Sequence, residues 1–105
     1  MGVDFGTDSV RSVLLDTTSG KEMATAVHFY RRWKEQKFCD PGKNRFRQHP
    51  LDHIEGLEST IKGVVEKSGI DPEKVRGICT DTTGSSPIAV TKDGTPLALV
   101  EGFEE

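Results

Sequence analysis

The stretch Asp4-Phe5-Gly6-Thr7-Asp8-Ser9-Val10-Arg11 lies near the start of the chain, between two short apolar runs, and decides how the fold begins. Residues 1–5 and 10–15 predict two strands, so the residues between them predict a tight turn. Such a turn gathers backbone N–H groups, two hydroxyls and a carboxylate at one point. Its composition is typical of a phosphate-binding turn, and also of an ordinary β-hairpin turn.

The residues of this stretch suit a phosphate ligand for separate reasons. Gly6 lets the backbone approach a ligand without a Cβ. The hydroxyls of Thr7 and Ser9 can donate hydrogen bonds to phosphate oxygens. Asp4 can hold a hydrated Mg²⁺ ion, because carboxylate oxygens are the ligands that this cation prefers. The stretch is therefore a candidate site for a phosphate and its metal.

Size and composition allow one small domain with a thin core. The chain has 105 residues, of which 33% are hydrophobic and 30% are charged. This balance indicates a heavily solvated surface or a missing partner surface. The net charge of −3, with both signs interspersed, favours neither nucleic acid nor an anionic membrane as a partner.

Cysteine usage and hydropathy indicate a cytoplasmic protein. Cys39 and Cys79 match neither a metal-ligand spacing nor a redox pair, which favours a reducing compartment and leaves a single disulfide open. No apolar stretch has the length of a transmembrane helix, and the N-terminus lacks the pattern of a secretion signal.

The remaining pattern predicts a mixed α/β sheet. Residues 23–30 alternate as a third antiparallel strand. A helix is expected from Pro50 to a C-terminal cap at Gly69. Its apolar face is expected to contain Leu51, Ile54, Leu57, Ile61, Val64 and Val65. A buried strand is expected at 75–80, and a terminal hairpin follows with strands at 88–90 and 97–99. The predicted order is therefore three antiparallel strands, a crossover helix, a further strand and a hairpin.

Two polar clusters are expected at one edge of this sheet. Asp4 ends the first strand and Asp81 follows the strand after the helix, so the two carboxylates can share a divalent cation. Alternatively, each accepts N–H bonds within its own turn. The segment 81–87 is rich in hydroxyls, which suits a polyhydroxylated ligand and equally an ordinary loop.

The segment 31–49 breaks every regular period and carries seven basic residues. It is either a solvated insertion or a surface that faces an anion. Its aromatic residues, Trp33, Phe38 and Phe46, can stack nucleobases or anchor the insertion, and the acidic net charge favours anchoring. The three histidines, His28, His49 and His53, lack a metal-ligand spacing, which favours capping or surface roles.

Residues 2–11 and four further motifs, in order along the chain, resemble the FGGY family of carbohydrate kinases. Residues 2–11 look like the first phosphate motif of that family. Within it, the chain is similar to the L-ribulokinase branch through Tyr30-Arg31-Arg32-Trp33-Lys34, Cys39-Asp40-Pro41, Phe46-Arg47-Gln48-His49-Pro50-Leu51-Asp52 and Asp81-Thr82-Thr83-Gly84-Ser85-Ser86-Pro87. The resemblance covers nearly the whole chain.

The resemblance implies an actin-like ATPase (ribonuclease H-like) fold and an ATP-dependent kinase that phosphorylates ribulose in arabinose catabolism. Asp4 matches the residue that organises Mg²⁺, and Asp8 stands where many members carry a second hydroxyl residue. Thr83, Gly84 and Ser85 match the wall of the sugar pocket. The ATP phosphates are expected to lie against Gly6, Thr7, Asp8, Ser9 and Arg11.

The resemblance also implies that these 105 residues are the N-terminal part of a kinase's first lobe. The family's catalytic aspartate and second lobe lie downstream, so the chain by itself is expected to be inactive. Open surfaces then make self-association an expected consequence. Two other classes stay open: a module that binds another protein chain, and a metal-dependent nuclease of ribonuclease H topology that uses Asp4 and Asp81.

Overall fold

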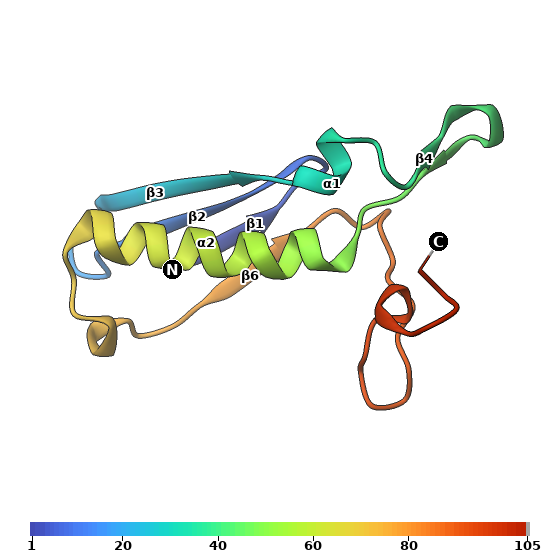
Figure 1. Ribbon diagram of the computed structural model, residues 1–105. Helices are drawn as coiled ribbons and strands as arrows, with labels where there is room; N and C mark the ends of the chain where they lie inside the picture. The colour runs from blue at the N-terminus through green and yellow to red at the C-terminus, as the bar shows by residue number, and fades with distance from the viewer. Residues whose placement is uncertain (105) are drawn as a thin grey trace.

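The protein is built on a four-stranded mixed sheet, which a computed structural model describes for residues 1–104, with Glu105 outside the described residues. The strands are β1 (Gly2–Phe5), β2 (Ser9–Leu15), β3 (Glu22–Phe29) and β6 (Cys79–Thr82). Their order is β3-β2-β1-β6. The first three pair antiparallel, whereas β6 pairs parallel with β1 (Figure 1). The predicted mixed α/β sheet, with its parallel return strand, is confirmed.

One long helix, α2 (Pro50–Ser68), crosses one face of this sheet (Figure 1). Before its first turn, Nδ1 of His49 accepts the Leu51 N–H at 3.2 Å, so the predicted capping role is confirmed for His49. The helix ends where Gly69 takes a φ of +66°, which favours glycine. Both predicted boundaries of the helix are confirmed.

The core is thin and lies between α2 and the sheet. Its buried apolar side chains form two clusters: Val3, Val10 and Tyr30, and Leu14, Ala24, Ala26 and Val64. A hydrogen bond of 2.7 Å from the Ser12 hydroxyl to the Thr60 hydroxyl joins β2 to α2 inside this core. A Cβ atom added to Gly56 would lie 2.4 Å from Cγ1 of Val10, so the helix packs directly against β2.

The predicted apolar face of α2 is only partly right. Ile54, which belongs to that face, is 51% exposed. The buried positions of the helix are Pro50, Asp52, Gly56, Thr60 and Val64. They lie on its inner side because a helix this close to a sheet accommodates small or hydrogen-bonded side chains better than long apolar ones.

The opposite face of the sheet is open. Side chains alternate between the two faces of a strand, so residues next to the buried Ala24 and Ala26 point away from α2. Met23, Val27 and Phe29 of β3 are 43%, 43% and 65% exposed. Apolar side chains of β3 therefore lie uncovered on this face.

The segment 31–49 contains more regular structure than the predicted loop. A short helix, α1 (Arg31–Lys34), is followed by β4 (Cys39–Asp40), the 3-10 turn η1 (Pro41–Lys43) and β5 (Arg45–Phe46). The two short strands pair antiparallel and project from the body of the molecule (Figure 1). Their pairing depends on a left-handed residue, Asn44 with a φ of +51°, which no hydrophobic period reveals.

The buried strand predicted for residues 75–80 is wrong in bounds and in burial. A 3-10 turn, η2 (Pro72–Lys74), precedes an irregular stretch, and β6 begins only at Cys79. All four residues of β6 are exposed. The reason is that β6 is an edge strand with β1 as its single neighbour.

The predicted C-terminal hairpin is wrong except at its turn. Val90 and Pro96 form a single β-bridge, and residues 97–99 form a 3-10 turn, η3 (Leu97–Leu99). Gly94 has the expected positive φ, +89°. This segment lies away from the sheet (Figure 1). The radius of gyration is accordingly 15.9 Å, above the ~13 Å typical of about 100 residues in one compact domain.

Two further features bear on the sequence predictions. Cys39 and Cys79 are both free, so the disulfide that the sequence left open does not form. Within residues 1–104, no helix combines the length and the apolar character that a bilayer crossing demands.

Candidate functional site

The β1–β2 turn (residues 6–8) is as tight as predicted. The Gly6 N–H donates to the Ser9 carbonyl at 2.9 Å, and the Ser9 hydroxyl donates to the Asp8 carboxylate at 2.9 Å. A Cβ at Gly6 would lie 3.2 Å from the Ser9 carbonyl oxygen, so glycine suits this position. The Gly6 N–H is engaged within the turn, and the exposed Thr7 and Asp8 form its tip.

Three charged side chains form a row beside this turn. The backbone register pairs Asp4 with Arg11 of β2 on one side and with Asp81 of β6 on the other. All three residues are exposed, whereas the neighbouring Val3 is buried under α2. The row therefore lies on the open face of the sheet, and its members line a shallow cleft of about 320 Å³. The predicted convergence of Asp4 and Asp81 is confirmed, and so, for Asp81, is the alternative, because its carboxylate accepts the Thr82 N–H at 2.9 Å.

The row offers the ligand types that Mg²⁺ prefers. Two carboxylates on adjacent strands are about 5 Å apart at their backbones. Among residues 1–104 no group of three or more His, Cys, Asp and Glu could hold a metal. An ion at Asp4 and Asp81 would thus take its other ligands from water and phosphate, as Mg²⁺ commonly does. The guanidinium of Arg11 adds a positive charge suited to a phosphate.

The backbone of Tyr30, the residue after β3, bonds to the β1–β2 turn. Its N–H donates to the Asp8 carbonyl at 2.8 Å, which ties the end of β3 to the turn. Burial, with the negative charges of Asp52, Asp4 and Asp8, raises the pKa of Tyr30 to about 12. The hydroxyl is therefore protonated at neutral pH, and its oxygen is buried with no hydrogen-bond partner in the described part of the chain.

Gln48 links the β1–β2 turn to the segment before α2. It was not among the site residues predicted from the sequence. Its Nε2 donates to the Gly6 carbonyl at 3.3 Å and to the Thr7 carbonyl. The signal in the sequence is its place inside the motif 46–52, which carried the resemblance without a role for this residue. The turn is thus held from outside the hairpin.

The loop after β6 brings the predicted sugar-pocket residues opposite Gln48. The Thr83 N–H donates to the Phe5 carbonyl at 3.3 Å, and the Thr83 hydroxyl donates to that of Ser86 at 3.2 Å. Thr83 lines a cleft of about 280 Å³ together with Phe5, Gln48, His53, Thr82, Ser86 and Ile88. Backbone pairing therefore fixes the start of this loop against the first strand.

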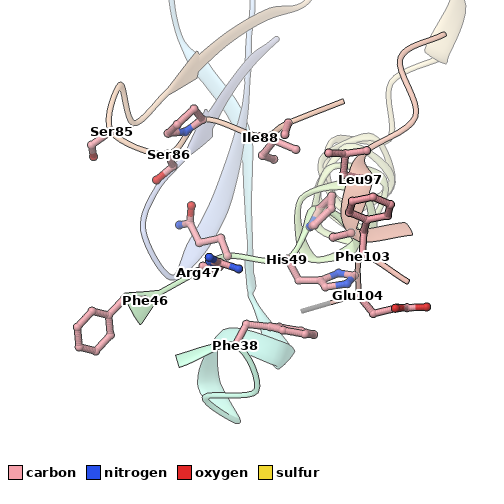
Figure 2. A pocket seen from close by; sticks show the side chains of 15 residues that line it. Phe38, Phe46, Arg47, His49, Ser85, Ser86, Ile88, Leu97, Phe103 and Glu104 are labelled. Atoms are coloured by element: carbon pink, nitrogen blue, oxygen red, sulfur yellow. The ribbon is translucent and has the colours of Figure 1, made fainter. Parts of the chain in front are cut away.

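Ser85 lines a second, larger cleft of about 490 Å³, while Gly84 lines neither cleft. Figure 2 shows Arg47 and His49 on one side of this cleft, Ser85 and Ser86 on the other, and Leu97 and Phe103 at one end. The two clefts share Gln48, Ser86 and Ile88. The predicted residues Thr83, Gly84 and Ser85 are therefore split between neighbouring surfaces rather than gathered in one pocket.

Part of the basic segment has a structural role. The Arg32 guanidinium bonds to Asp52 at 2.7 Å and to Glu55 at 2.9 Å. These bonds raise the pKa of Arg32, and the same guanidinium lowers the pKa of Glu55. The Asp52 carboxylate also accepts the Trp33 N–H at 3.2 Å and has no exposed surface. The motifs around Arg32 and Asp52 thus join α1 to α2.

The aromatic residues of the segment largely anchor it, as predicted. Trp33 packs against the core cluster of Val3, Val10 and Tyr30. Phe38 stacks on the ring of His49 at 4.9 Å. Phe46 differs, because it is 56% exposed at the edge of the larger cleft, where its ring points away from the other labelled side chains (Figure 2).

Comparison with known proteins gives a consistent set of relatives, although no protein-family model matches the chain. It is 38% identical over 105 residues to a ribulokinase of Vibrio parahaemolyticus, covering 99% of this chain and 18% of the relative. It is 34% identical over 110 residues to a ribulokinase of Halalkalibacterium halodurans, and 38% over 112 residues to one of Mycolicibacterium smegmatis; each match covers 100% of this chain and 20% of the relative. The chain thus spans about a fifth of the length of these relatives. Over its whole length the chain is therefore similar to part of a ribulokinase.

Proposed function

We propose that the chain supplies the phosphate- and Mg²⁺-binding turn and one wall of the sugar pocket in an ATP-dependent kinase that phosphorylates ribulose in arabinose catabolism. In this proposal residues 1–105 are part of the first lobe of an actin-like (ribonuclease H-like) ATPase in the cytoplasm. The matches to ribulokinases over the whole chain support it. So does the mixed sheet with one crossover helix. Neither nucleic acid nor a membrane is among the proposed partners.

The observation that carries the proposal is the row Arg11–Asp4–Asp81 beside the β1–β2 turn. Asp4 would hold Mg²⁺, with Asp81 next to it, and Arg11 would neutralise phosphate charge. Thr7, Asp8 and Ser9 are at or beside the exposed tip, where a phosphate can approach. ATP with Mg²⁺ supplies the phosphoryl group and part of the charge neutralisation, so the protein's task is to position and to stabilise.

The sugar side of the proposal uses the loop after β6. Thr83, Gly84 and Ser85 begin directly beyond the strand that carries Asp81. Sugar hydroxyls both donate and accept hydrogen bonds, and the hydroxyls of Thr83, Ser85 and Ser86 have the same capacity. A ribulose in the smaller cleft would thus lie at the same end of the sheet as the turn, on the side of α2, where Phe5 and His53 line this cleft.

The proposal predicts that the 105-residue chain alone forms no ADP from ATP and L-ribulose. It spans about a fifth of its relatives, and the resemblance assigns the group that removes the sugar proton to a position outside these residues. The decisive test is therefore a chimera. This chain replaces the matching part of the Vibrio parahaemolyticus ribulokinase, to which it is 38% identical. Ribulose-dependent ADP formation by the chimera is the expected result.

Two variants of the chimera test the site itself. Asp4→Asn removes the proposed metal ligand with little change in shape, and we expect a fall in kcat of about a hundredfold or more. Glu66→Gln is the matched control, because Glu66 is an exposed carboxylate on α2, away from the row. Equal activity of both variants, or a chimera that folds without turnover, would contradict the proposal.

A second function has a specific observation in its favour: the open apolar face of the sheet. Met23, Val27 and Phe29 lie there with Leu15, which is 46% exposed. Contiguous exposed apolar side chains mark protein interfaces. As a non-catalytic module, the chain would bind another chain or itself through this face. Light scattering tests this, because a monomer whose mass does not change with concentration would count against it.

A further inference from the structure

His53, near the N-terminal end of α2, lines the smaller cleft of about 280 Å³ and is partly exposed. Two aromatic rings hold its imidazole. The Phe5 ring lies at a centroid distance of 5.7 Å and an interplanar angle of 79°, and the Tyr30 ring lies at 5.1 Å and 73°. Such edge-to-face contacts favour one orientation of the ring. The folded chain therefore places the imidazole of His53 without the help of a ligand.

Both ring nitrogens of His53 are accessible and unpaired. Within residues 1–104 neither takes part in a hydrogen bond, and neither is among the polar atoms that are buried without a partner. Both therefore keep accessible surface. The ring meets the core on the side of Tyr30, which is fully buried, so its exposed part borders the cleft. A ligand in the cleft can thus reach the imidazole.

The lining of the smaller cleft suits a neutral ligand that carries hydroxyl groups. Among the described residues, no Asp, Glu, Lys or Arg lines it, whereas charged residues line the cleft at the row Arg11–Asp4–Asp81. Burial lowers the pKa of His53, so its imidazole is neutral at pH 7 and offers one N–H donor and one acceptor. A sugar hydroxyl, which can both donate and accept, can pair with either nitrogen.

From this geometry we infer that His53 is a specificity-determining residue for the sugar: one nitrogen of its imidazole forms a hydrogen bond with a hydroxyl of the pentulose that does not receive the phosphoryl group. The inference rests on the proposed function, because it takes the smaller cleft for the sugar side. It assigns His53 a binding role and no part in proton transfer.

Neighbouring polar side chains in this cleft are already engaged within the chain. The Thr83 hydroxyl donates to that of Ser86 at 3.2 Å. Nε2 of Gln48 donates to the Gly6 carbonyl at 3.3 Å, and its Oε1 is buried. His53 offers a donor and an acceptor that the described chain leaves unused. Because its ring is already oriented, binding a hydroxyl costs it little further side-chain entropy.

The test combines a change in the protein with a change in the sugar, in the active chimera described above. His53→Phe keeps an aromatic ring beside Phe5 and Tyr30 and removes both nitrogens. Each protein is assayed with L-ribulose and with analogues that lack one hydroxyl other than the phosphoryl acceptor. We expect one analogue to lose roughly tenfold in kcat/KM with the parent chimera, and less than about twofold with His53→Phe.

The matched control is His28→Asn, which alters a partly exposed histidine that lines neither cleft. It should discriminate against the same analogue as strongly as the parent chimera does. Circular dichroism shows whether each variant folds. If His53→Phe does not fold, His53→Leu removes the same nitrogens with a smaller side chain and is judged by the same criterion.

The outcomes separate the inference from the proposed function. An active chimera in which every analogue loses the same factor with and without the imidazole would overturn the inference and leave the kinase proposal intact. Equal loss of discrimination in His28→Asn would also overturn it, because the effect would then not belong to the cleft. A folded chimera without ribulose-dependent turnover would remove both.

Discussion

Asp52 offers the sharpest test of how this fold is held together. Its carboxylate is completely buried and accepts three hydrogen bonds: 2.7 Å from the Arg32 guanidinium, 3.3 Å from the Arg32 N–H and 3.2 Å from the Trp33 N–H. It therefore caps α1 and pairs a charge at the same time. Asp52→Asn keeps the shape and removes the charge, which leaves the guanidinium with one carboxylate partner, Glu55.

The expected loss of stability follows from these contacts. Removing one partner of a buried ion pair typically lowers the free energy of unfolding by about 3–5 kcal/mol. Arg32 keeps Glu55 at 2.9 Å and its side chain is 13% exposed, so the lower end applies. With about 3 kcal/mol lost, and roughly 4–8 °C per kcal/mol for a chain of this size, the Tm falls by about 12–24 °C.

Thermal and urea unfolding, followed by far-ultraviolet circular dichroism, measures this change. The control is Glu55→Gln, which breaks the other half of the same cluster. Glu55 is 43% exposed, and a pair at the surface contributes only about 0–1 kcal/mol. If Asp52→Asn and Glu55→Gln lose the same stability within about 0.5 kcal/mol, the argument from burial is wrong.

Two other features give predictions of the same kind. Gly56→Ala places a Cβ atom 2.4 Å from a side-chain carbon of Val10 in β2. The resulting overpacking, which costs about 1–3 kcal/mol, should exceed the gain of up to ~1 kcal/mol in helix propensity, so we expect a lower free energy of unfolding. Urea unfolding measures this loss, with Gly77→Ala as the control because a Cβ there meets nothing within 4 Å. Burial holds the pKa of His53 below 6.5, against the opposing charge of Asp52. As the pH drops below 6.5, the unfolded chain therefore binds more protons than the folded chain, and the free energy of unfolding should fall. Urea unfolding at several pH values should show that this free energy depends less on pH in His53→Phe.

Local signals explain why the first half of the fold was predictable. Each of these signals determines the backbone of only a few neighbouring residues. They are the turn residues around Gly6, the proline in the first turn of α2 and the positive φ of Gly69. Such signals predicted the three antiparallel strands and both ends of the helix. The placement of Asp4 and Asp81 at one edge of the sheet also followed, because a right-handed crossover returns the chain parallel to an earlier strand.

Non-local packing explains what the sequence could not predict. The run from Val75 to Thr80 is apolar enough for a buried strand, yet burial requires elements on both sides, and β6 has a neighbour only in β1. Residues 97–99 lie away from the edges of the sheet and form a 3-10 turn instead (Figure 1). Gln48 was missed for a related reason, since its two carbonyl partners lie more than 40 residues away.

The helix shows how the thin core and the open surfaces share one cause. Because Gly56 and Thr60 let α2 sit directly on β2, the inner side of the helix needs few apolar atoms. Of the apolar side chains that set its period, Ile54 is half exposed, whereas Leu57 packs against the core cluster of Val3, Val10 and Tyr30. The low hydrophobic content therefore reflects close packing on one side of α2 and apolar surface left open elsewhere, in a chain that spans about a fifth of its relatives.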